Sequence, residues 1–179
     1  MKLIILDRDG VINEDSDQFI KSPDEWLPLP GSLEAIALLN RAGYRVVVIS
    51  NQSGLGRGLF DIQALNAIHD KMLLCLSVLG GQIESILFCP HSPDEQCECR
   101  KPKAGMFLDL QHRLNISLND VHAVGDSLRD LQAAQLVNAL PVLVRTGKGA
   151  ATLANGKGLE GIPVFADLAE FTQHLLYSQ

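Results

Sequence analysis

Two aspartates near the start of the chain are the residues best placed to do chemistry. Asp7 and Asp9 follow the apolar run Leu3–Leu6 and precede Gly10. Four apolar residues in a row predict a strand that is buried on both faces, as in a parallel sheet. Ligands bind beyond the carboxyl ends of such strands, and a carboxylate pair there needs a cation to offset its self-repulsion. We interpret the pair as a Mg²⁺ site with one carboxylate free to attack phosphorus, although the pattern alone also fits a solvated turn.

Polar residues follow two further predicted strands and favour the first interpretation. Ser50 and Asn51 come directly after the strand predicted at 45–49, and Asp126 comes soon after the strand predicted at 121–124. Because the carboxyl ends of parallel strands meet at one edge of a sheet, these side chains should face one crevice. Oxygen ligands from a second aspartate suit Mg²⁺, and a hydroxyl can stabilise a transferring phosphoryl group.

A basic segment supplies the opposite charge. Arg100, Lys101 and Lys103 precede a helix predicted at 104–114, where the positive end of the helix dipole adds to their attraction for phosphate. Lys101 can neutralise charge on a phosphoryl group in transfer. Asp9 can protonate the leaving oxygen and then deprotonate an attacking water. These residues together indicate phosphoryl transfer.

Three cysteines and a histidine form a second cluster with chemical meaning. Cys89, His91, Cys97 and Cys99 occur as C-x-H and C-x-C pairs five residues apart. Such a set can close a tetrahedral zinc site with no open position, so we assign it a structural Zn²⁺. The alternative is free buried thiols beside a surface histidine. The zinc loop would span residues 89–99 and would fix the position of Arg100 and Lys101.

The remaining pattern predicts one α/β domain over residues 1–179, with a Rossmann-like parallel sheet flanked by helices. We expect Ser32, Asp61 and Asp167 to cap helices, and the stretch 146–161 to form a mobile loop. The expected strands lie at 3–6, 45–49, 83–89, 121–124, 141–144 and 162–165. The expected helices lie at 32–42, 62–79, 104–114, 128–137 and 167–176.

Composition limits the possible partners. The net charge of −6 argues against a protein that binds nucleic-acid phosphates. No apolar run reaches membrane-spanning length, and the chain enters its first strand without a leader. We therefore expect a cytoplasmic monomer that contacts neither nucleic acid nor membrane.

Four motifs, taken in order, resemble those of the haloacid-dehalogenase (HAD) superfamily of phosphotransferases. They are D-R-D-G at 7–10, S-N-Q-S-G at 50–54, R-K-P-K at 100–103 and G-D-S-L-R-D at 125–130. The resemblance covers about the first 147 residues. Within the superfamily, the chain most resembles the family of D-glycero-D-manno-heptose 1,7-bisphosphate 7-phosphatases, small Mg²⁺ enzymes with an integral zinc loop. That family implies a phosphorylated sugar as substrate, a role in making lipopolysaccharide-core precursors, and no large cap domain.

The resemblance also implies a role for individual residues. Asp7 would be the nucleophile and Asp9 the acid/base, and Mg²⁺ would be held by Asp7, by the Asp9 backbone carbonyl and by Asp126. Ser50 and Lys101 would stabilise the phosphoryl group. The residues that would contact substrate are Asp15, Ser16, Asp17, Gln18, Ser50, Asn51, Gln52, Ser53, Arg100 and Lys101.

Two positions after the metal aspartate need separate treatment. Some relatives have lysine where this chain has Ser127, so no substrate contact is assigned there. Asp130 is expected to be a structural carboxylate that supports the site and does not bind the metal directly. We expect no chemical role for five other residues, which are His69, Cys75, His112, His122 and His174.

Three alternatives stay open at this point. Histidinol-phosphate phosphatases share the fold, the four motifs and a zinc loop. A DNA 3′-phosphatase would share the catalytic core, but the acidic net charge and the lack of a basic stripe weigh against it. A zinc-stabilised interaction module without catalysis would not need Asp7, Asp9, Lys101 and Asp126 all to be present.

Overall fold

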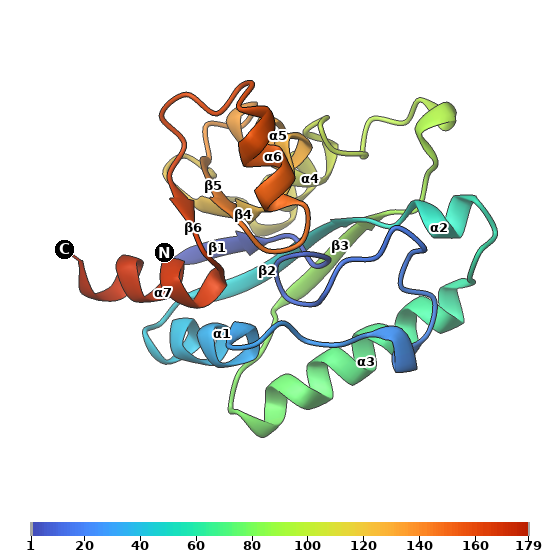
Figure 1. The fold of residues 1–179 in the computed structure, drawn as a ribbon, viewed down its shortest axis with the longest axis horizontal. Helices are drawn as coiled ribbons and strands as arrows, with labels where there is room; N and C mark the ends of the chain where they lie inside the picture. Colours follow the sequence, from blue (N-terminus) through green and yellow to red (C-terminus); the bar gives the residue numbers. More distant parts are fainter. Residues whose placement is uncertain (1, 179) are drawn as a thin grey trace.

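Six parallel strands form one sheet, in the order β3-β2-β1-β4-β5-β6 (Figure 1). The computed structural model describes residues 2–178. The strands are β1 (Leu3–Leu6), β2 (Arg45–Asn51), β3 (Ser85–Cys89), β4 (His122–Gly125), β5 (Leu140–Val144) and β6 (Val164–Phe165). The central strand β1 pairs with β2 and with β4, so that Ile5 lies opposite Val47 on one side and Ala123 on the other.

Helices cover both faces of this sheet (Figure 1). The helices are α1 (Ser32–Arg41), α2 (Ser53–Gly56), α3 (Ile62–Val78), α4 (Gly105–Leu114), α5 (Leu128–Gln135), α6 (Gly149–Asn155) and α7 (Leu168–Tyr177), with 3-10 turns at Pro23–Glu25 and Pro93–Glu95. Side chains of a strand point alternately to its two faces. Ile4 and Leu6 accordingly pack in the core under α1, α3 and α7, whereas Leu3 and Ile5 pack in the core under α4 and α5.

The functional edge of the sheet lies where the strand order reverses. The chain leaves β1 toward β2 on one side and later returns to place β4 on the other side. The loops after β1 and β4 therefore separate around a crevice at the carboxyl ends of the strands, which is the general position of ligand sites in open α/β sheets. Within the described chain, the segment between β2 and α3 holds only the four-residue helix α2, so no cap domain is inserted there.

Most expected elements are present, and two local predictions are wrong. Ser32 does not cap α1: the cap residue is Gly31, and the Ser32 hydroxyl donates instead to the carbonyls of Ile12 (2.6 Å) and Leu29 (2.9 Å). The stretch 146–161 is not an irregular loop throughout, because residues 149–155 form α6. That helix is fixed to the fold by the Thr152 hydroxyl, which donates to the Asp126 carbonyl at 2.9 Å.

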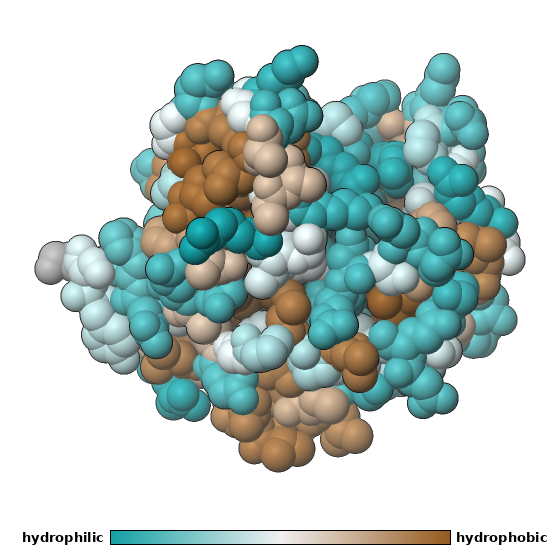
Figure 2. Space-filling model, viewed as in Figure 1, coloured by the Kyte–Doolittle hydropathy of each residue, from teal (hydrophilic) through white to brown (hydrophobic). Residues whose placement is uncertain are grey.

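In the same view, the right-hand half of the surface is mostly hydrophilic, and an apolar group lies at the lower edge (Figure 2). The lower apolar group lies over the C-terminal end of α3, where Leu74, Val78 and Leu79 are exposed. Among the described residues, no helix combines the length and the apolar character needed to span a bilayer.

The cap of α3 gives a direct test of the local structure. The Asp61 carboxylate accepts a hydrogen bond from the Ala64 backbone N–H at 2.8 Å. We expect Asp61→Ala to lower the free energy of unfolding by about 1 kcal/mol, because a helix-terminal N–H loses its partner. Asp70→Ala, at an exposed position inside the same helix, should change it by less than about 0.5 kcal/mol. Urea denaturation measures both, and equal losses would contradict the capping role.

Candidate active site

A buried lysine between two buried carboxylates forms the floor of the site. The Lys101 ammonium lies 3.0 Å from Asp7 and 2.8 Å from Asp130, and all three side chains are less than 10% exposed. Burial alone would lower the pKa of Lys101, but the charges of Asp130 and Asp7 outweigh it and raise that pKa. Burial raises the pKa of Asp7 to about 6, against the opposing effect of Lys101. One cation thus compensates two acids only in part.

A third carboxylate adds to the negative charge. Oxygens of Asp7, Asp126 and Asp130 lie within 4.8 Å of one another. Burial, followed by the neighbouring charge of Asp7, raises the pKa of Asp126 to about 8. Three hard oxygen donors with too little positive charge among them are the donor set that suits Mg²⁺. The described residues at this position therefore fit a divalent cation.

Two glycines allow Asp126 to lie this close to the first loop. A Cβ at Gly10 would lie 2.1 Å from an Asp126 oxygen, and one at Gly147 would lie 2.3 Å from it. Both glycines have positive φ, a region that other residues rarely adopt. The backbones after β1 and β5 can approach Asp126 only because these positions lack side chains.

Asp9 is held by donors on both of its carboxylate oxygens. Arg8, Asn13 and Gln52 each donate to it, at 2.9 to 3.0 Å. Burial alone would raise the pKa of Asp9, but the charge of Arg8 and these hydrogen bonds outweigh it and hold that pKa below its usual value. Gln52 also donates to the Ser50 hydroxyl at 2.8 Å, which links Asp9 to the end of β2.

The end of β2 also positions Lys101. The Asn51 side chain accepts from the Lys101 backbone N–H and donates to the Lys101 carbonyl, both at 3.0 Å. The Lys101 ammonium donates in addition to the Ile49 carbonyl at 2.8 Å. Asn51 thus fixes the backbone of a residue fifty positions away along the chain, and the lysine side chain then points back toward Asp7.

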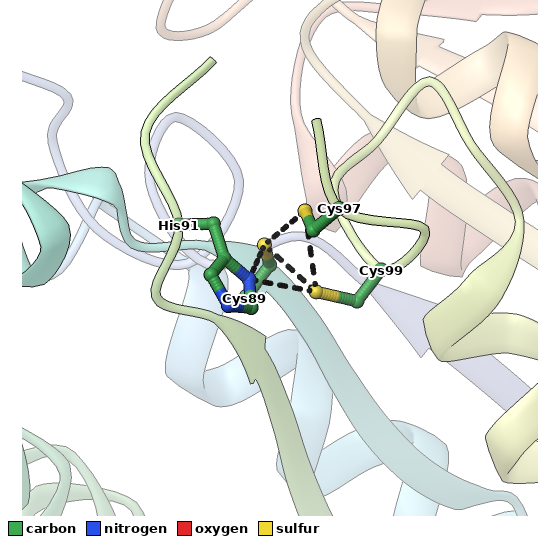
Figure 3. Close-up of side chains that lie close together, drawn as sticks. All are labelled: Cys89, His91, Cys97 and Cys99. Atoms are coloured by element: carbon green, nitrogen blue, oxygen red, sulfur yellow. Dashed lines mark hydrogen bonds between the residues drawn. The ribbon is translucent and has the colours of Figure 1, made fainter. Parts of the chain in front are cut away.

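The predicted zinc ligands come together at the end of β3, which holds Cys89, and in the loop that follows it (Figure 3). Ligand atoms of Cys89, His91, Cys97 and Cys99 lie within 4.8 Å of one another and could hold a metal ion. The Cys99 sulfur is 3.0 Å from that of Cys89 and 3.2 Å from His91 Nδ1. A tetrahedral Zn–S site has an edge of about 3.8 Å, so the four groups are already within the span of a single ion. Arg100, directly after this cluster, donates to the His91 carbonyl at 3.3 Å.

A pocket of about 200 Å³ opens above Asp7 and Asp9. Six of the predicted substrate residues line it, namely Asp15, Ser16, Asn51, Gln52, Ser53 and Arg100. Asp17 and Gln18 are exposed and lie outside the lining. Ser50 and Lys101 are buried beneath it, where they contact Gln52 and Asp7.

Five lining residues had no predicted role, namely Phe19, Ile20, Arg57, Arg129 and Lys148. Arg57 lies over the Phe19 ring, with its guanidinium carbon 5.9 Å from the ring centroid. Burial and the charge of Arg129 lower the pKa of Arg100, and both arginines line this pocket. One feature of the sequence could have pointed to a further cation at this side of the site: the chain has Ser127 where some relatives have lysine. Ser127 caps α5 instead, donating to Asp130 at 2.6 Å, and Arg129 brings positive charge two residues later.

The fold and the site define a HAD-type phosphotransferase. A family model described as HAD-hydrolase-like matches residues 98–171. The D-glycero-beta-D-manno-heptose-1,7-bisphosphate 7-phosphatase of Bordetella bronchiseptica is 58% identical over 98% of both chains. That of Pseudomonas aeruginosa is 50% identical over 97% of both. The chain therefore belongs to the D-glycero-beta-D-manno-heptose-1,7-bisphosphate 7-phosphatase family.

Solved structures agree with this assignment. The B. bronchiseptica D,D-heptose 1,7-bisphosphate phosphatase, complexed with magnesium and phosphate, has a TM-score of 0.98 and 57% identity, with both chains covered completely. The corresponding phosphatase from Burkholderia thailandensis has a TM-score of 0.79 and 49% identity over 99% of both chains. The family predicted from the sequence motifs is confirmed.

The lysine between the carboxylates leads to a prediction about stability. Lys101→Met should lower the free energy of unfolding at pH 7 by about 3 to 5 kcal/mol, because it leaves buried carboxylates without a counter-charge. Arg113→Met removes an exposed ion pair with Asp109 (2.8 Å) and should cost less than about 1 kcal/mol. Urea denaturation of both variants measures the difference.

The pH dependence gives a second check on the same variant. Asp7 already has a raised pKa of about 6, and loss of Lys101 should raise it further. Below that pKa the carboxyl group is neutral and needs no cation, so the cost of Lys101→Met should shrink as the pH falls. The compensating role of Lys101 would be contradicted if Lys101→Met lowered the free energy of unfolding no more than Arg113→Met does, or if its effect grew toward low pH.

Proposed function

We propose that this chain removes the C7 phosphate from D-glycero-D-manno-heptose 1,7-bisphosphate through a phosphoaspartyl intermediate. The observation that carries the proposal is the pocket, which is lined by Asp7 and Asp9 together with Arg57, Arg100 and Arg129. The identity to relatives of this name over nearly the whole chain supports the same substrate. Histidinol phosphate, the alternative from the sequence, carries one phosphate and would leave more of this cationic lining unpaired.

The proposed reaction has two steps. Asp7 attacks phosphorus, the bond from phosphorus to the sugar oxygen breaks, and Asp9 gives a proton to that oxygen. Asp9 must take up this proton before the step, because its pKa lies below the usual value. Asp9 then takes a proton from water, the water oxygen attacks phosphorus, and the bond to Asp7 breaks to release phosphate. Lys101, 3.0 Å from Asp7, and Ser50 at the end of β2 would stabilise the phosphoryl oxygens.

Two metals complete the proposal. Asp7, the Asp9 backbone carbonyl and Asp126 would hold Mg²⁺, which neutralises phosphate charge when it is bound. The Mg²⁺ in the B. bronchiseptica structure supports this choice. Zn²⁺ would be held by Cys89, His91, Cys97 and Cys99, as their ligand atoms within 4.8 Å of one another suggest. With four protein ligands the zinc has no open position for water, so its role would be structural.

The arginines would recognise the second phosphate. The described contacts pair Arg57 with an aromatic ring and Arg100 with a backbone carbonyl, not with carboxylates. Guanidinium groups bind phosphate oxygens in a fork and are well suited to that role. The product would be a heptose monophosphate for surface-glycan precursors such as the lipopolysaccharide core. A cytoplasmic monomer remains part of the proposal.

The substrate assignment is tested by comparing kcat/KM for three phosphates. We expect heptose 1,7-bisphosphate to exceed both heptose 7-phosphate and histidinol phosphate, because a site with buried charges rejects ligands that leave them unpaired. Arg129→Met should lower kcat/KM for the bisphosphate about 10- to 100-fold, the value of a charge-assisted hydrogen bond, and should change the monophosphate far less.

Two controls make this comparison specific. Arg113→Met, an exposed arginine of α4 outside the pocket, should leave all three values unchanged. Asp7→Asn should remove turnover of every substrate, because the amide lacks a nucleophilic oxygen. If kcat/KM for histidinol phosphate equalled or exceeded that for heptose 1,7-bisphosphate, the assignment would move to histidine biosynthesis. Turnover by Asp7→Asn, with deamidation excluded by mass spectrometry, would exclude the phosphoaspartyl route.

The two metals should differ in how easily they leave. Brief EDTA treatment should abolish activity, and Mg²⁺ alone should restore it while about one zinc per chain stays bound, because a closed thiolate site binds tightly. Cys97→Ser should lose zinc and much of the activity, whereas Cys75→Ser, on α3, should lose neither. Elemental analysis and phosphate release measure both. Wild-type protein without zinc, or a zinc-free variant with normal kcat/KM, would contradict this role.

A further inference from the structure

A fully buried arginine lies next to Asp9 and is not used in the reaction proposed above. The Arg8 side chain is 0% exposed. Its Nε and Nη2 lie 2.9 Å and 2.8 Å from Asp9 Oδ1, and Nη2 also lies 3.0 Å from Asp9 Oδ2, so the guanidinium contacts both carboxylate oxygens. Charge-assisted contacts to both oxygens restrain the plane of a carboxylate as well as its distance. Arg8 thus controls the orientation of Asp9.

The third arm of the guanidinium meets a histidine from α3. Arg8 Nη1 lies 3.4 Å from His69 Nε2, and His69 is 7% exposed. Because a guanidinium can only donate, His69 Nε2 must be the acceptor, and the imidazole must therefore be neutral with its proton on Nδ1. Burial, together with the charge of Arg8, lowers the pKa of His69 to about 4, which agrees with a neutral ring.

His69 is itself held in place by the fold. It lies on the buried face of α3 with Leu65, Ile68 and Met72, and its ring centroid is 6.2 Å from that of Phe88 on β3. The helix and the sheet edge therefore fix the ring, the ring fixes Arg8, and Arg8 fixes Asp9. A contact that served only to fill space could use apolar side chains at lower desolvation cost.

We propose that Arg8 and His69 are positioning residues that hold the Asp9 carboxyl in line to protonate the leaving oxygen of an alkyl phosphate. The proposal rests on the phosphatase function proposed above. In the step concerned, Asp7 forms a bond to phosphorus, the bond from phosphorus to the ester oxygen breaks, and the Asp9 proton moves to that oxygen. An alkoxide needs this proton in order to leave, whereas 4-nitrophenolate is a stable anion and leaves without it.

The difference between the two leaving groups supplies the test. His69→Leu and Arg8→Lys should lower kcat/KM for heptose 1,7-bisphosphate about 10- to 100-fold, the range expected for a misplaced acid. The same variants should lower kcat/KM for 4-nitrophenyl phosphate less than about 3-fold, because no proton is needed. His69→Gln keeps an acceptor for Arg8 and should stay close to wild type with both substrates.

A second histidine-to-leucine change serves as the matched control. His122→Leu, on β4, removes a half-buried ring that lies 5.5 Å from that of Phe171, and it should affect neither substrate. Thermal denaturation identifies any variant that fails to fold. His69→Gln and Arg8→Lys keep a polar group at each position, so the comparison remains possible if His69→Leu is unfolded.

The outcomes separate this proposal from the substrate assignment. A parallel fall with both phosphates, or no fall with either, would overturn the positioning role. A wild-type enzyme with low kcat/KM for the heptose bisphosphate would instead overturn the substrate. In that case the comparison is repeated with glycerol 3-phosphate, which has an alkoxide leaving group and needs the same proton.

Discussion

A cluster of buried carboxylates at the carboxyl ends of the strands is the constraint around which the site is built. Oxygens of Asp7, Asp126 and Asp130 lie within 4.8 Å of one another, and one buried ammonium, that of Lys101, contacts two of these acids. Such a cluster is costly in a buried environment. The same excess of charge makes the site able to bind a divalent cation and, with that cation, a phosphate. The uncompensated negative charge of this cluster thus both destabilises the fold and makes the proposed chemistry possible.

Lys101 can compensate these acids only because two distant segments hold it there. Asn51, at the end of β2, binds both polar groups of the Lys101 backbone. On the preceding side, the cysteine cluster ends at Cys99, two residues before the lysine, and Arg100 is tied to the His91 carbonyl. The segment between β3 and α4 contains one 3-10 turn and is otherwise irregular. Without these contacts, few interactions would hold it in one conformation. This gives a proposed structural metal a direct link to the active site.

The sequence by itself determined much of this protein. Short apolar runs separated by amphipathic stretches were enough to predict a parallel sheet, because both patterns are local. The pairs Asp7–Asp9 and Cys97–Cys99 were recognisable because their members lie two residues apart and carry the right ligand atoms. The motifs also arrive in a fixed order, which identified the family correctly. Capping by Asp61 and Asp167 followed from local hydrogen bonding and is confirmed.

Only the tertiary structure decided which other side chains reach the site. Arg57, at the end of α2, and Arg129, in the first turn of α5, line one pocket although they come from distant segments, and no spacing rule encodes such a convergence. His69 looked like an ordinary helix residue, yet the packing of α3 on the sheet brings it to Arg8. The helix at 149–155 was missed because seven residues are too few to form a stable helix alone, and its stability depends on contacts such as that of Thr152 to the Asp126 carbonyl. Local chemistry can be read along the chain, whereas proximity between distant segments is set by packing.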